Sequence, residues 1–142
     1  MTNSRALTQP ARAFLALAEP AGRLDTGPHT ANLLAELAQL VRARAPISQI
    51  ILAATISDSL AHEQSEFDDE EDAPDGFAWL SRQEVEPLLW LRERRNQLVH
   101  YQGITEGMTG QYDTKDVVHL KADADAALSA LLPLLEEREI IG

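Results

Sequence analysis

The sequence predicts an all-α domain, a bundle of four or five helices. Apolar residues recur at intervals of three and four along several long stretches, which is the spacing of one helix face. Capping residues, prolines and glycines separate these stretches. The strand–helix alternation of a parallel sheet is missing. The length of 142 residues suits one domain, so we assign residues 1–142 to a single unit.

The expected helices are bounded by residues that favour helix starts and stops. Thr30 is a plausible N-cap of the second helix, and Ser81 to Glu84 resembles a capping box at the start of the fourth. Asp123 or a neighbour is expected to cap the last helix. β-branched residues in the third stretch also suit a strand, but its length favours a helix. In chain order the helices are expected over residues 10–19, 30–44, 47–62, 81–99 or 81–101, and 122–140.

Two segments carry open alternatives. The acidic segment, about residues 65–76, suits a solvated loop; the alternating oxygen ligands and central glycine of a calcium loop are absent there. Residues 111–120 are ambiguous, because Val117 to Leu120 suits either a short strand or an extended lead-in to the last helix.

Composition limits the classes of function. The net charge of −11 argues against broad electrostatic binding to nucleic acid, although a local basic site is compatible with it. The chain has no cysteine, and its four histidines are scattered, so we expect neither a metal site nor a cofactor. No apolar stretch reaches transmembrane length and no signal-peptide pattern begins the chain. We therefore expect a cytoplasmic protein without membrane contact.

One arginine of the fourth helix occupies an unexpected position. A helical projection places Arg95 inside an apolar stripe that includes Leu88 and Leu98. A guanidinium stays charged, so a buried one needs an anionic partner, a subunit interface or a cleft. Asp58 or Glu86 could supply a carboxylate, which would make Arg95 part of an ordinary ion pair.

Neighbouring polar residues point to another role. Asn96 and His100 are four residues apart and share a helix face, and with Arg92 and Arg95 they form a polar patch beside the stripe. Histidine transfers protons near neutral pH, and arginine stabilises charge on phosphate. This pair suits RNA cleavage without a metal, because the 2′-hydroxyl is a built-in nucleophile.

The run Arg95-Asn96-Gln97-Leu98-Val99-His100 resembles the hallmark motif of the HEPN superfamily: an arginine, a polar residue, and a histidine after four to six residues. The resemblance implies a helical bundle that dimerises through the motif-bearing helices. It implies that Arg95 and His100 are catalytic and that Asn96 supports them. Many prokaryotic members are metal-independent ribonucleases of toxin–antitoxin, abortive-infection or CRISPR-associated defence systems, which implies a cognate antitoxin as partner.

Further residues complete the predicted site. Arg92 and Arg94 are expected to contact RNA phosphates, and Asp58 and Tyr101 to support the site. One HEPN subgroup carries a tyrosine two residues after the histidine, which a nucleotidyltransferase partner modifies with AMP. Here Tyr101 follows His100 directly, a departure from that subgroup. Tyr101 either lines the cleft, stacks on a base, or is a half-buried aromatic at a helix end.

Three functional hypotheses follow. The first is a metal-independent endoribonuclease, the toxin of a toxin–antitoxin or antiviral defence system. The second is a non-catalytic module that binds a nucleotide or a partner such as a nucleotidyltransferase. The third is a helical interaction protein with Arg95 in an internal ion pair. Five helical residues turn through about 140°, so Arg95 and His100 of one chain diverge. The first hypothesis therefore expects a composite site built from two copies in a homodimer.

Overall fold

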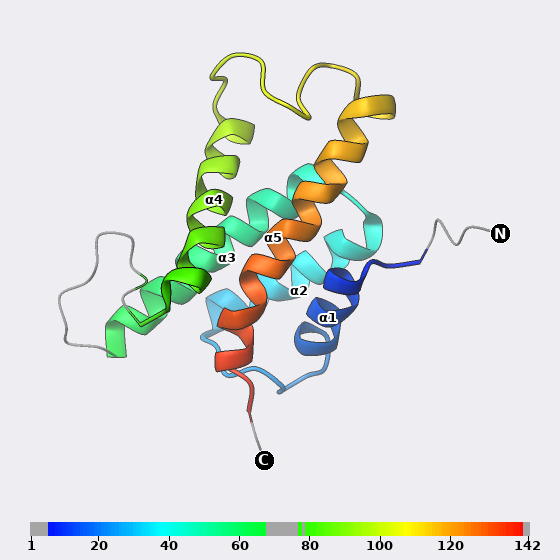
Figure 1. Ribbon diagram of the computed structural model, residues 1–142. Coiled ribbons are helices and arrows are strands. Elements are labelled where there is room, and N and C mark those ends of the chain that lie inside the picture. The colour runs from blue at the N-terminus through cyan, green and yellow to red at the C-terminus, as the bar shows by residue number, and fades with distance from the viewer. Residues whose placement is uncertain (1–5, 68–76, 78, 141–142) are drawn as a thin grey trace.

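The computed structural model describes residues 6–67, 77 and 79–140, and it is all-helical over this part of the chain (Figure 1). One isolated antiparallel bridge, between Leu24 and Glu139, joins the segment before the second helix to the end of the last. The elements are α1 (Gln9–Ala18), α2 (Pro28–Ala43), α3 (Pro46–Phe67), α4 (Arg82–Val99), the π-helical turn η1 (Tyr112–Asp116) and α5 (Val117–Glu137). The prediction of an all-α fold with four or five helices is thus confirmed over the described residues.

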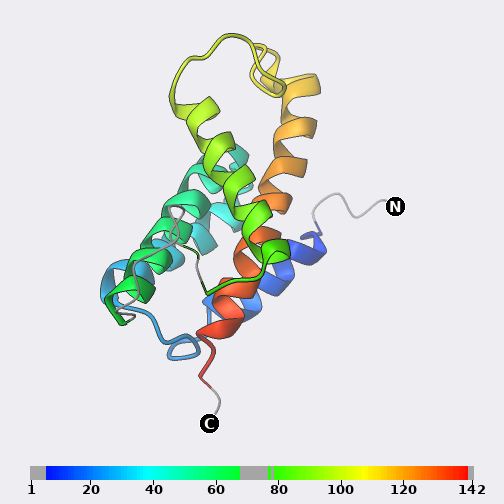
Figure 2. The same cartoon turned by 60° about the vertical axis from the view of Figure 1, so that its left-hand side comes forward.

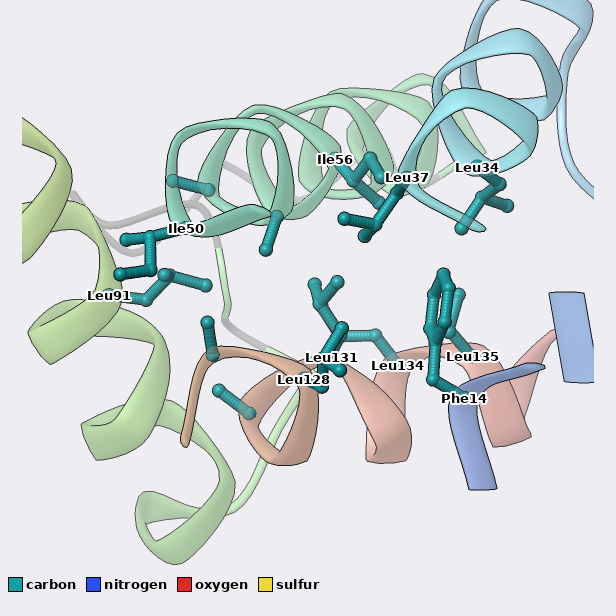
Figure 3. Packing of buried hydrophobic residues seen from close by; sticks show 14 of the residues in the cluster. Phe14, Leu34, Leu37, Ile50, Ile56, Leu91, Leu128, Leu131, Leu134 and Leu135 are labelled. Carbon is teal, nitrogen blue, oxygen red and sulfur yellow. The ribbon is translucent and has the colours of Figure 1, made fainter. Parts of the chain in front are cut away.

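Two helices form the centre of the bundle. α3 packs against α2, α4 and α5, and α5 packs against α1, α3 and α4. Figure 3 shows Leu91 of α4 pointing toward Ile50 of α3, and Phe14 of α1 beside Leu135 of α5. The segment between α4 and α5 lies at the end of the bundle away from the C-terminus, in both views (Figures 1 and 2).

Local sequence explains where α4 begins. The Ser81 hydroxyl accepts from the Glu84 backbone N–H, and the Glu84 carboxylate accepts from the Ser81 backbone N–H. This reciprocal capping box satisfies donors that a helix N-terminus otherwise leaves open, and it was predicted correctly. Pro87 lies inside α4, one turn after its start, rather than at the start.

The start of α2 corrects one prediction. Thr30 is not the N-cap, because α2 begins at Pro28 with Gly27 as its cap. Proline is favoured in the first turn, where its missing N–H removes no hydrogen bond. The Thr30 side chain is instead buried and hydrogen-bonds to Ser59 and Glu63 of α3. It therefore joins two helices rather than beginning one.

α3 extends further toward its C-terminal end than predicted. The helix runs to Phe67 and so includes the first residues of the predicted acidic loop, 65–76. Residues 68–76 lie outside the described part of the chain, and the hypotheses about that loop stay predictions.

The start of α5 contradicts both alternatives for residues 111–120. Val117 to Leu120 form the first turn of α5, neither a strand nor an extended lead-in, and Asp123 lies inside the helix instead of capping it. Asp116, just before it, is buried and accepts from the backbone N–H groups of Thr109 and Gln111. Burial alone would raise the pKa of the Asp116 carboxyl, but hydrogen bonds from Gln111 and Thr109 outweigh it and lower that pKa. This local network overrides the strand preference of two adjacent valines.

Candidate functional site

One carboxylate on α3 holds two arginines of α4. Asp58 Oδ2 lies 2.8 Å from Arg95 Nη1, and Asp58 Oδ1 lies 3.2 Å from Arg92 Nη2. The side chains of Asp58, Arg92 and Arg95 are 40%, 32% and 23% exposed. The three groups therefore form a half-buried ionic cluster at the α3–α4 seam that solvent still reaches.

The sequence named Asp58 and Glu86 as possible ion-pair partners of Arg95. The structure brings Arg95 to Asp58, whereas Glu86 pairs with Arg82 on the exposed side of α4. Within the described part of the chain, Arg95 donates a hydrogen bond from Nη1 to the Asp58 carboxylate. The rest of its guanidinium keeps donors suited to a phosphate oxygen.

Arg92 is held from a second side. Its guanidinium carbon lies 5.2 Å from the centre of the Phe77 ring, within the range of a cation–π contact. Phe77 is buried and its ring lies 5.8 Å from that of Trp79. These contacts anchor Arg92 beside the core while its carboxylate contact with Asp58 keeps it in the cluster.

The histidine of the motif lies where α4 ends. α4 ends at Val99, and His100 is its C-cap in an extended conformation, with its backbone N–H donating to the Asn96 carbonyl. The His100 side chain is exposed, and Tyr101 is 89% exposed. Asn96, one turn before His100, is partly buried. Tyr101 is thus not the half-buried helix-end aromatic of one alternative.

Arg94 occupies a position that the sequence analysis did not predict. Its side chain is 6% exposed, and its Nε lies 2.9 Å from Asp123 Oδ2 of α5. Its Nη1 donates to Gln97 and its Nη2 donates to the Glu106 carbonyl. The expected contact of Arg94 with RNA phosphates does not fit this placement, because its guanidinium is buried and every nitrogen already has an acceptor.

The apolar stripe on α4 explains this difference. The inward face of the helix carries the buried residues Leu88, Leu91 and Arg94, whereas Leu89 is 39% exposed. Arg94 and Arg95 follow Leu91 by three and four residues, the two spacings that continue a helix face. They lie about 100° apart around the axis, so one reaches α5 and the other α3. The position of Leu91 in the stripe is the signal that could have identified Arg94.

Other residues near Arg94 were missed as well. His119 Nε2 lies 3.4 Å from Asp123 Oδ2 and 3.6 Å from Glu106 Oε2. His119 and Asp123 come from α5, and Glu106 comes from the segment between α4 and α5, outside the motif at residues 95–100. Among the residues described, no three His, Asp or Glu side chains are grouped so as to hold a metal ion.

Four apolar or aromatic side chains from the end of α4, the following segment and the start of α5 are strongly exposed: Val99 at 47%, Tyr101 at 89%, Ile104 at 80% and Val118 at 71%. Exposed apolar side chains are candidates for contact with another molecule when they lie together. Two of the four, Val99 and Tyr101, flank His100 in the chain.

Comparison of the chain with protein-family models, with curated proteins and with solved structures found no match. None of the helices described has the length and apolar character needed to cross a membrane. Assignment of a function therefore rests on the residues and their geometry.

Proposed function

We propose that the chain is a metal-independent endoribonuclease whose catalytic groups are Arg95 and His100. The observation that carries the proposal is the Asp58–Arg95 contact of 2.8 Å, which holds a partly exposed arginine on the same helix that ends at an exposed histidine. A carboxylate that fixes one side of a guanidinium leaves its other donors oriented for an anion. Asp58 is then a positioning residue for Arg95, and Asn96 and Arg92 support the same helix segment.

The chemistry requires one base, one acid and one group that stabilises charge. A neutral His100 takes the proton of the RNA 2′-hydroxyl, and the oxygen attacks the adjacent phosphorus. The bond from phosphorus to the 5′-oxygen breaks, and the protonated His100 of a second copy gives its proton to that oxygen. The products are a 2′,3′-cyclic phosphate and a 5′-hydroxyl. Arg95 stabilises the charge that develops on the non-bridging phosphate oxygens.

The proposal includes a homodimer. Arg95 contacts Asp58 of α3 and His100 caps the end of α4, so we expect the two groups of one chain to diverge. Two copies that meet through the ends of their α4 helices would bring both pairs together. The exposed Val99 and Tyr101 suit such an interface. By its resemblance to HEPN toxins, the dimer would act in a toxin–antitoxin or antiviral defence system and be held inactive by an antitoxin.

A second candidate is a non-catalytic module that binds a nucleotide or a protein such as a nucleotidyltransferase. The exposed apolar side chains beside His100 in the chain favour it, because protein partners cover such groups. The Asp58–Arg95 ion pair by itself is also what a plain helical interaction protein would contain.

The deciding experiment measures RNA cleavage in the presence of a chelator. Wild type, Arg95→Ala and His100→Ala are compared, with the exposed Arg82→Ala as the matched control. We expect cleavage by wild type and the control, and a loss of about 100-fold or more in the two site variants, the scale of one proton-transfer group. Cleavage that survives either site substitution, or a wild type that binds nucleotide without cutting RNA, would overturn the proposal.

A mixing experiment tests the composite site. Wild type and His100→Ala chains are unfolded together, refolded at several ratios, and assayed. If both copies contribute His100 to one site, activity falls with the square of the wild-type fraction. A site complete within one chain would give activity in direct proportion to that fraction instead.

A further inference from the structure

The buried guanidinium of Arg94 lies where α4, α5 and the segment joining them meet. It donates to Asp123 on α5 at 2.9 Å, to Gln97 on α4 at 2.8 Å, and to the carbonyl of Glu106 in the joining segment. Arg94 is 5% exposed, so these bonds are formed away from bulk water. A charged donor in such a place is costly unless every nitrogen finds an acceptor, which is the case here.

The joining segment packs directly against this guanidinium. Gly107 has a φ of +86°, and a Cβ added there would lie 2.9 Å from Arg94 Nη2 and 3.1 Å from side-chain carbons of His119 and Leu120. The backbone therefore approaches Arg94 more closely than any residue with a side chain allows. Such an approach fixes the position of residues 106 and 107.

A separate anchor fixes the other half of the segment. The Asp116 carboxylate accepts from the backbone N–H groups of Thr109 and Gln111 and from the Thr109 hydroxyl. The first half, residues 101–106, runs from the end of α4 to the Glu106 carbonyl. His100 stands at the start of this stretch, tied to α4 by its N–H bond to Asn96.

We propose that Arg94 is the positioning residue for His100. By holding the Glu106 carbonyl and Gly107 against α4 and α5, it sets the path along which the chain leaves His100 and so the direction of the His100 imidazole. The catalytic meaning of this role rests on the proposed ribonuclease function. The structural part, control of His100 by a buried arginine on the same helix, stands independently of that function.

Two glycines offer a matched test. Gly107 and Gly110 both have a φ of +86°, but nothing lies within 4 Å of a Cβ at Gly110. Gly107→Ala and Gly110→Ala therefore carry the same backbone strain, and only the first pushes the segment away from Arg94. Arg94→Lys is the second variant, because it keeps a cation for Asp123 but loses the fork that also reaches Glu106. Folding of each variant is checked by circular dichroism and thermal melting.

The readouts are the NMR signal of the His100 imidazole and amide hydrogen exchange over residues 101–106. We expect Gly107→Ala and Arg94→Lys to shift or broaden the His100 signal and to speed exchange in this stretch. Gly110→Ala should leave both unchanged. In an RNA cleavage assay we expect Gly107→Ala to lower kcat by about 10- to 100-fold with KM unchanged, the effect of a misplaced catalytic group.

Each outcome bears on a different statement. A His100 signal and exchange pattern that are the same in Gly107→Ala and Gly110→Ala would overturn the positioning role of Arg94, whether or not the protein cleaves RNA. Disturbed His100 signals with an unchanged kcat would overturn the catalytic part of the proposal, because the direction of His100 would then not matter to the reaction. A wild type without cleavage activity, but with the expected NMR differences, would refute the ribonuclease function and leave the control of His100 by Arg94 supported.

Discussion

Arg95 binds the carboxylate of Asp58 with Nη1 at 2.8 Å from Oδ2, across the seam between α4 and α3. Arg92, one turn earlier on α4, binds the other oxygen of the same carboxylate at 3.2 Å. One carboxylate thus contacts two guanidinium groups of α4 and orients both of them.

Replacement of Asp58 by asparagine separates positioning from stability. The pair is partly exposed, and such ion pairs contribute about 1 kcal/mol or less to the free energy of unfolding. We therefore expect Asp58→Asn to unfold at nearly the wild-type urea concentration, yet to cleave RNA about 10-fold more slowly or worse, since Arg95 loses its orientation. A variant with full activity would show that Asp58 does not position Arg95.

The inward face of α4 can be tested with two leucines. Leu91 is fully buried and Leu89 is 39% exposed, although they are only two residues apart. Leu91→Ala should lower the free energy of unfolding by about 2–5 kcal/mol, because it removes buried methyl groups and leaves a cavity. Leu89→Ala should change it by about 0.5 kcal/mol. Equal effects in urea unfolding would contradict the orientation of α4.

Breaking the buried Arg94–Asp123 pair should cost much more stability than breaking an exposed pair. The two side chains are 6% and 17% exposed, so Asp123→Ala leaves a buried guanidinium without its carboxylate. We expect a loss of about 3–5 kcal/mol in the free energy of unfolding. Glu86→Ala, which breaks the exposed Arg82–Glu86 pair on the same helix, is the control and should cost about 0.5 kcal/mol. Similar losses for both variants would rule out the buried role of Arg94.

The Glu63 carboxyl should make the free energy of unfolding depend on pH in the acid range. Burial raises the pKa of its carboxyl, but hydrogen bonds from Thr30, the Gly27 N–H and Arg138 outweigh burial and hold that pKa below its usual value of 4.5. A carboxyl with a lowered pKa stabilises the folded state above its unfolded pKa, and this contribution is lost as the pH falls through the folded pKa. The contribution should therefore be complete at neutral pH and decline below about pH 4.5.

The measurement compares wild type with Glu63→Gln in urea at a series of pH values. The difference in free energy of unfolding between the two proteins should be constant from pH 7 to about pH 5 and shrink at lower pH. A difference that stays constant into the acid range would show that ionisation of Glu63 does not stabilise the fold.

The sequence predicted correctly those structural features that depend on residues close together in the chain. The capping box at Ser81 and Glu84 depends on residues three apart, and it placed the start of α4 correctly. Asp58 was named together with Glu86 as a possible partner of Arg95, and the structure pairs Arg95 with Asp58. Sequence did not reveal that Arg94 is the buried arginine, because this depends on which helices flank α4 on its two sides.

At the start of α5, the local sequence pattern led to a wrong prediction. Two adjacent valines at 117 and 118 favour a strand by their β-branched side chains. In the structure they begin a helix. The Asp116 carboxylate just before them accepts hydrogen bonds from the backbone N–H groups of Thr109 and Gln111, and α5 packs against three other helices. Tertiary contacts of this kind are not visible in a local pattern.

The two anchors of the segment between α4 and α5 differ in how far apart their partners lie along the chain. Asp116 holds residues five and seven positions away, whereas Arg94 reaches Glu106 and Asp123 over twelve and twenty-nine positions. Closing a short loop costs less chain entropy than closing a long one. During folding we therefore expect residues 109–116 to become ordered first, and the stretch beside His100 to become ordered last, only when α4 has docked on α5.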